Sequence, residues 1–146
     1  ACSNFEFVLK DNDLENQFKN KVSIFFEGYK NKIFSEELYF FLGNNKDGDF
    51  ILVTQFSEKK ENRLIKKNQV AEKIDYKLTA DYELYYRSRN CKVYEQQIVS
   101  KFSFVPKSFG YNFGTERSLE KLYKASVKRN IQNFINSSSS NTACIK

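Results

Sequence analysis

The chain has 146 residues, a net charge of +6 and 40% apolar residues, among them 15 Phe and 9 Tyr. This length fits one domain, and the apolar fraction is enough to form a core without a metal or a disulfide framework. No stretch approaches the roughly 18 apolar residues of a membrane-spanning helix. The chain contains no His, the commonest general base and metal ligand. We therefore expect no cofactor, no metal and no enzymatic activity.

The basic charge favours an anionic partner, such as a nucleic acid, an anionic lipid or an acidic protein surface. Most of the positive charge is Lys and Asn is abundant, a composition that codon bias in an AT-rich genome also produces. A nucleic-acid-binding module is one alternative for the function. However, the aromatic residues fall mostly on apolar faces of the predicted elements and not among the lysines, so we expect no nucleic-acid partner.

The chain begins with a predicted strand followed by a helix. The run 'KVSIFFEG' at 21–28 is apolar and ends at a glycine, as short strands often do. The helix that follows has Ser35 as its expected N-cap, with Glu36 and Glu37 in the first turn, where they complement the helix dipole. Its apolar spacing also allows a start near Lys30.

Two strands and a charged segment follow this helix. The run 'DFILVTQFSE' at 49–58 is rich in β-forming residues, and 'EKKENRLIKKNQ' at 58–69 is expected to be a connection. The next segment alternates strictly, with apolar residues at Ile74, Tyr76, Leu78, Ala80, Tyr82 and Leu84. Such alternation predicts a strand with one face on a core and the other exposed to water or a polar partner.

The last part of the chain predicts a return strand and a long helix. The run 'CKVYEQQIVSKFSFVP' at 91–106 completes a long β-hairpin, and Thr115 is the expected N-cap of the helix. An apolar stripe at helical spacing comprises Leu119, Leu122, Tyr123, Val127, Ile131, Phe134 and Ile135. The opposite side carries a basic stripe of Arg117, Lys121, Lys124 and Lys128.

This order of elements predicts an α+β fold, namely a two-layer α/β sandwich. We expect about four strands in a mixed sheet, including the long antiparallel hairpin. The first helix would cross over between two parallel strands, and both helices would pack on one face. The other face would remain uncovered. We expect residues 1–20 to be an N-terminal tether and residues 21–136 to be the domain. The composition of residues 137–146 predicts a flexible Ser-rich tail.

The run from 'EELYFFLGNN' through 'DFILVTQFSE' and 'LTADYELYY' to the closing helix resembles the lipopolysaccharide-assembly lipoprotein family, LptE, especially its alphaproteobacterial members. The resemblance extends from Val22 to Ile135. It implies a protein that plugs the LptD outer-membrane β-barrel, helps it to assemble and assists insertion of lipopolysaccharide into the outer leaflet. A periplasmic adaptor lipoprotein with another partner is the remaining alternative.

The same resemblance implies a role for the opening 'AC'. Family members carry a lipobox that ends in a small residue before Cys, so Ala1 would be the last signal-peptide residue and Cys2 the lipidated N-terminus. The protein would then be anchored to the periplasmic side of the outer membrane by its acyl chains.

Two basic clusters are candidates for contact with lipopolysaccharide phosphates, since Lys can serve as a point charge for phosphate. The preferred cluster comprises Lys59, Lys60, Arg63, Lys66 and Lys67. The weaker candidate is the helical stripe Arg117, Lys121, Lys124 and Lys128, which is also what the solvent-facing side of an ordinary helix would show. Cys91 and Cys144 are able to pair in an oxidising compartment, but nothing in the sequence requires it, and we expect them to be unpaired.

Overall fold

The computed structural model describes residues 17–64, 72–106, 112–138 and 143–145. The elements of this part are, in chain order, β1 (Val22–Phe26), α2 (Lys32–Leu42), β2 (Phe50–Leu64), β3 (Glu72–Tyr86), β4 (Cys91–Phe104) and α3 (Asn112–Ser138). The strands form one sheet in the order β1-β2-β3-β4. β1 pairs with β2 in parallel, and the other two pairs are antiparallel. The predicted α+β class and mixed sheet are confirmed.

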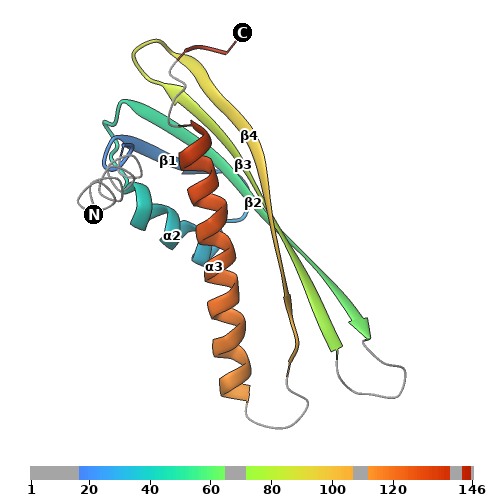
Figure 1. Cartoon of the computed structure of the whole chain (residues 1–146). Helices are drawn as coiled ribbons and strands as arrows, with labels where there is room; N and C mark the ends of the chain where they lie inside the picture. The colour runs from blue at the N-terminus through green and yellow to red at the C-terminus, as the bar shows by residue number, and fades with distance from the viewer. Residues whose placement is uncertain (1–16, 65–71, 107–111, 139–142, 146) are drawn as a thin grey trace, which may run out of the picture.

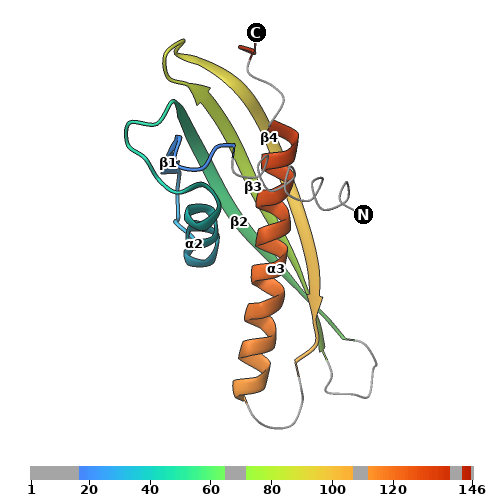
Figure 2. The ribbon, with the colours of Figure 1, turned by 60° about the vertical axis from the view of Figure 1, so that its left-hand side comes forward.

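Both helices lie on the same face of the sheet (Figures 1 and 2). α3 runs along β4 and β3, and α2 lies beside it against the β1 end. In the part of the chain that the structure describes, no element covers the other face, which we call the open face. Neither described helix has the length and apolar character that a membrane crossing needs.

The hydrophobic core lies between the sheet and the helices. The alternation of β3 is confirmed, because its buried core residues are Tyr76, Leu78, Ala80, Tyr82 and Leu84. α3 contributes Tyr123, Val127, Ile131, Phe134 and Ile135 from its predicted apolar stripe. Aromatic rings fill much of this layer: Tyr82 stacks on Phe134 with 4.3 Å between ring centroids, and Phe34 stacks on Phe56 at 4.5 Å.

The start of α2 differs from the preferred prediction. The helix begins at Lys32, and its N-cap is Asn31, whose side-chain oxygen accepts a 2.9 Å hydrogen bond from the backbone N–H of Phe34. Ser35 is buried inside the helix and donates to the Lys32 carbonyl at 3.0 Å, so it is not the cap. The acidic first turn expected with Ser35 was therefore also wrong. The earlier start near Lys30 was the better alternative.

Two other boundaries also differ. Residues 58–64, expected to be part of a connection, continue β2 and pair with β3 as far as Leu64 opposite Glu72. A ladder of backbone hydrogen bonds does not require apolar side chains, so composition alone is a poor guide to where this strand ends. α3 begins at Asn112 and not at Thr115. The first helical turn contains backbone donors without intrahelical partners, and many sequences can therefore occupy it.

Candidate functional site

Three residues of the predicted site lie outside the described part of the chain. Cys2 belongs to the segment 1–16, and Lys66 and Lys67 belong to the segment 65–71. Lipidation of Cys2 and contact of the two lysines with lipopolysaccharide therefore stay predictions.

The other three members of the preferred basic cluster do not form one patch. Alternation along β2 places Lys59 and Arg63 on the open face and Lys60 on the helix-covered face. Arg63 pairs with Asp75 through a 2.6 Å contact, and the Lys60 ammonium lies 5.6 Å from the centre of the Tyr76 ring. The sequence grouped these cations because they are close along the chain, whereas a strand separates neighbours onto opposite faces.

The weaker candidate cluster is exposed on α3. Arg117, Lys121 and Lys128 are exposed, and Lys124 forms a 3.3 Å ion pair with Glu120 one turn earlier. Because α3 lies on the covered side of the sheet, this stripe and the open face belong to opposite layers of the molecule. The structure therefore does not bring the two predicted basic clusters together.

Strand pairing creates a basic row that sequence analysis missed. Lys59, Lys77 and Lys101 lie directly opposite one another on β2, β3 and β4. All three are exposed on the open face. They line a hollow of about 490 Å³, together with Glu61, Asp75, Tyr76, Phe102 and Ser103. Like charges in directly opposed positions destabilise a sheet, and negative charge nearby would offset the repulsion among these lysines.

Negative charge lies in the next row, toward the far ends of the strands. Glu61, Asp75 and Ser103 are opposite one another on the same face. Ser103 donates a 2.7 Å hydrogen bond to Asp75. This bond, together with the Arg63 guanidinium, lowers the pKa of Asp75. Glu61 lies 3.8 Å from Lys59. In the described residues, no ion pair connects Lys77 or Lys101 to a carboxylate.

The other end of the open face is acidic. Glu83 and Glu95 are directly opposite, and Lys92 contacts both carboxylates at 3.5 Å and 3.1 Å. Tyr85 donates a 2.6 Å hydrogen bond to Glu83, and this bond is the main reason that the pKa of Glu83 is lowered. Asp81 lies in the neighbouring row, where Gln97 donates to it at 2.9 Å. The open face therefore carries a lysine row and an acidic pair that lie three rows apart along the strands.

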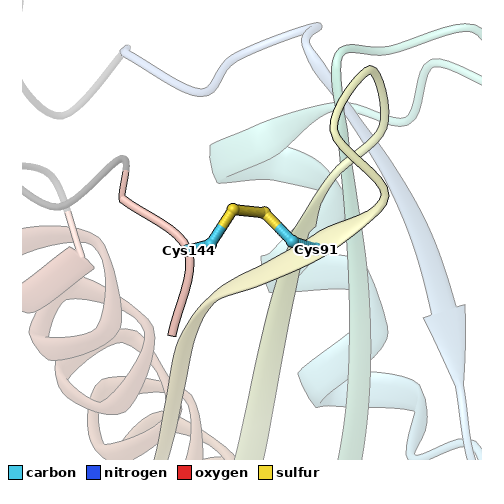
Figure 3. The surroundings of a disulfide bond; sticks show 2 residues. All are labelled: Cys91 and Cys144. Atoms are coloured by element: carbon cyan, nitrogen blue, oxygen red, sulfur yellow. A yellow bond between two sulfur atoms is a disulfide. The ribbon is translucent and has the colours of Figure 1, made fainter. Parts of the chain in front are cut away.

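A disulfide joins Cys91 at the start of β4 to Cys144 in the C-terminal segment (Figure 3). The two Cα atoms are 5.7 Å apart, and the backbone N–H of Ile145 donates to the Lys92 carbonyl at 2.7 Å. The expectation of unpaired cysteines was wrong. Residues 143–145, in the segment expected to be a flexible tail, are thus attached to β4. Cysteines separated by 53 positions give no signal of pairing in the sequence.

No protein-family model and no curated protein sequence match this chain. Solved structures do match it. A protein of Caulobacter crescentus CB15, described as a lipoprotein, superposes with a TM-score of 0.61 at 10% identity, over 88% of this chain and 93% of that one. A minor lipoprotein from Acinetobacter baumannii gives a TM-score of 0.56 at 13% identity, over 83% of this chain and 91% of the other.

Rare lipoprotein B from Shewanella oneidensis gives a TM-score of 0.52 at 12% identity, over 82% of this chain and 93% of that one. The chain shares the fold of these lipoproteins. The similarity extends over nearly the whole length of each neighbour, so it concerns the complete two-layer domain and not a single motif. At this low identity it establishes the fold alone.

Proposed function

We propose that the chain is an outer-membrane lipoprotein that plugs an LptD-type β-barrel, helps it to assemble and assists insertion of lipopolysaccharide into the outer leaflet. The observation that carries this proposal is the fold shared with three lipoproteins, one of them named rare lipoprotein B. The segment from Val22 to Ile135 also resembles the LptE family in the order of its elements, and this resemblance supports the proposal independently.

A plug inside a barrel needs a polar outer surface on more than one side, because barrel interiors are polar. This chain has two such surfaces, the open face of the sheet and the outer side of α3. Export with a signal peptide that ends at Ala1, followed by acylation of Cys2, would hold the protein at the inner surface of the outer membrane. More than one acyl chain is required for stable anchoring.

The barrel partnership is tested by co-purification. The gene with its leader is expressed together with the LptD-type barrel of the same genome, and the complex is purified through a tag placed after Lys146. The proposal predicts an equimolar, detergent-stable complex and acyl chains on Cys2. Recovery of a lipidated protein without the barrel would favour the adaptor alternative. Recovery of an unlipidated protein would show that the role given to Cys2 is wrong.

The lipopolysaccharide contact is tested separately. Lys66 and Lys67 remain the preferred residues, and Lys59 and Arg63 are the members of their cluster that lie on the open face. We expect Lys66→Glu with Lys67→Glu to weaken binding of purified lipopolysaccharide about tenfold, because each reversal replaces attraction with repulsion. The matched control reverses Lys19 and Lys46, which are exposed and belong to neither predicted cluster. An equal loss in the control would show that only net charge matters.

A further inference from the structure

We propose that the open face is also the interface of a homodimer, in which a second copy packs face to face with its strands antiparallel to the first. The observation behind this proposal is the charge order along the strands. The lysine row and the acidic row make the face self-complementary, because Lys77 and Lys101 of one copy meet Glu83 and Glu95 of the other. The proposal does not depend on the barrel partnership. Because the open face cannot contact a barrel wall and a second copy at the same time, the dimer is a state of the protein outside the barrel.

The matching follows from a two-fold axis that lies midway between the two facing sheets, parallel to their planes and perpendicular to the strands. Such an axis leaves each strand facing its own copy and reverses the direction along it. With the axis between the row of Asp81 and the row of Thr79, Lys77 faces Glu83 of the second copy. Lys101 then faces Glu95 of the second copy, because these residues occupy the same two rows on β4.

The neighbouring rows agree with this arrangement. The row of Glu61, Asp75 and Ser103 would face the row of Ile51, Tyr85 and Lys92. Asp75 then meets the Tyr85 hydroxyl and Ser103 meets the Lys92 ammonium, whereas Glu61 meets Ile51 on β2. The central rows carry Ser57, Thr79 and Val99 in one and Gln55, Asp81 and Gln97 in the other, so hydrogen-bonding groups meet near the axis on β2 and β3. A different axis, parallel to the strands, would place lysine on lysine.

The arrangement also accounts for two unfavourable pairings within one copy. Lys77 lies between two other lysines across the sheet, and Glu83 lies opposite Glu95. Each arrangement costs stability in an isolated sheet. Within the described part of one copy, Lys92 is the one cation that contacts the acidic pair. A second copy would place Glu83 against Lys77, and lysines against both Glu83 and Glu95.

The size of the face indicates a weak, salt-sensitive dimer. Six rows on three strands cover about 40 Å by 15 Å, which is about 600 Å² per copy and lies at the lower limit for specific interfaces. Twisted sheets pack face to face at about 30°, so the rows nearest the axis would make the closest contacts. Most of the attraction would come from charge, and it would be screened by salt.

The experiment uses charge reversal on the soluble 146-residue chain with Cys2→Ser, which prevents disulfides between copies. One variant combines Lys77→Glu with Lys101→Glu, and the other combines Glu83→Lys with Glu95→Lys. Sedimentation equilibrium should show each variant alone dissociating at least about tenfold more readily than the parent protein. An equimolar mixture of the two should dimerise again, because every reversed row then meets its complement.

Two controls keep the test decisive. Reversal of Lys121 and Lys128 on the outer side of α3 should leave the dimer unchanged. The parent dimer should weaken about tenfold when salt rises from about 0.05 M to about 0.5 M. A monomeric parent protein, a dimer that both reversed variants retain, or a mixture that stays monomeric would each overturn the proposal. Inorganic phosphate that binds the lysine row of a monomeric parent would assign the row to a small anion instead.

Failure of this test does not affect the proposed barrel partnership. That partnership is tested with the lipidated protein co-expressed with the barrel, whereas the dimer is tested with the Cys2→Ser chain alone. Conversely, a soluble dimer that forms by this face would be obtained even if no barrel partner existed. The two outcomes are therefore distinguishable.

Discussion

The hydroxyl of Tyr82 on β3 donates a 2.7 Å hydrogen bond to the side-chain oxygen of Asn130 on α3, and both residues have no exposed surface. The Asn130 amide in turn donates to the Ile98 carbonyl on β4 at 2.9 Å. The Asn130 side chain therefore connects α3 to both β3 and β4, with its oxygen and its amide nitrogen both hydrogen-bonded inside an apolar layer. A polar group buried this deeply is costly when unpaired, so this arrangement favours one registration of α3 on the sheet.

Replacement of Tyr82 by Phe tests this point. The ring that stacks on Phe134 remains, but the Asn130 oxygen loses its donor. We expect the free energy of unfolding to fall by about 1–3 kcal/mol, measured by urea denaturation. Tyr29→Phe is the matched control, because Tyr29 is 81% exposed and should change stability by less than about 0.5 kcal/mol. Equal effects of the two substitutions would contradict the proposed role of the buried bond.

Stability should decrease at alkaline pH, most of all because of two tyrosines whose pKa is raised more than that of Tyr85 and Tyr94. Burial raises the pKa of Tyr82 well above its usual value, and burial together with the hydrogen bond to Glu58 raises the pKa of Tyr123. Unfolded tyrosine loses its proton near pH 10, so above that pH the unfolded state binds fewer protons than the folded state. The stabilisation should be complete below about pH 10 and should be lost as the pH rises further.

The measurement is the free energy of unfolding as a function of pH from about 8 to about 11. Tyr82→Phe and Tyr123→Phe should each reduce the slope above pH 10, because one titrating group has been removed. An unchanged slope in both variants would show that other groups cause the alkaline loss.

The disulfide between Cys91 and Cys144 should contribute strongly to stability. It closes a loop of 53 residues, for which the chain-entropy relation gives about 4 kcal/mol. We expect Cys144→Ser to lower the urea midpoint and to make it independent of reductant, whereas the midpoint of the parent protein should fall when reductant is added. Peptide mapping that finds both thiols free in the purified, air-oxidised protein would contradict the pairing.

Gly48 should not tolerate a side chain. A Cβ atom there would overlap the backbone of Lys21 and Val22, at the point where the turn before β2 meets the start of β1. We expect Gly48→Ala to destabilise the protein by about 1–3 kcal/mol in thermal unfolding, since the backbone cannot move aside as a flexible side chain would. Asp47→Ala in the same exposed turn is the control. Wild-type stability in Gly48→Ala would show that the turn relaxes freely.

The fold was largely predictable from local patterns. Alternation from Ile74 to Leu84 identified the buried face of β3, and the spacing from Tyr123 to Ile135 identified the buried side of α3. Each element buries one side in the same apolar layer, and the spacing of its own apolar residues is enough to identify that side. Element ends were less predictable: the cap at Asn31 also donates to the Tyr123 hydroxyl at 3.1 Å, a contact that local sequence does not reveal.

The candidate site was less predictable, because it depends on strand register. Lys59, Lys77 and Lys101 are far apart in the chain and form a row only after β2, β3 and β4 have paired. A signal did exist. Alternation places Lys77 and Lys101 on the same face of the hairpin, but a register shift between Leu84 and Tyr85 means that counting from the turn would have placed Lys77 opposite Ser100. The disulfide gave no comparable signal, because the pairing of distant cysteines is a property of the folded chain.

The measurement that tests the plug most directly is photocrosslinking in cells that contain both the lipidated protein and its barrel. A photoreactive residue replaces Thr79 on the open face in one strain and Lys121 on the outer side of α3 in another. A protein inside a barrel is surrounded by it, so the account predicts crosslinks to the same barrel from both opposite faces. Crosslinks from one face alone, or from neither, would contradict a plug inside the barrel.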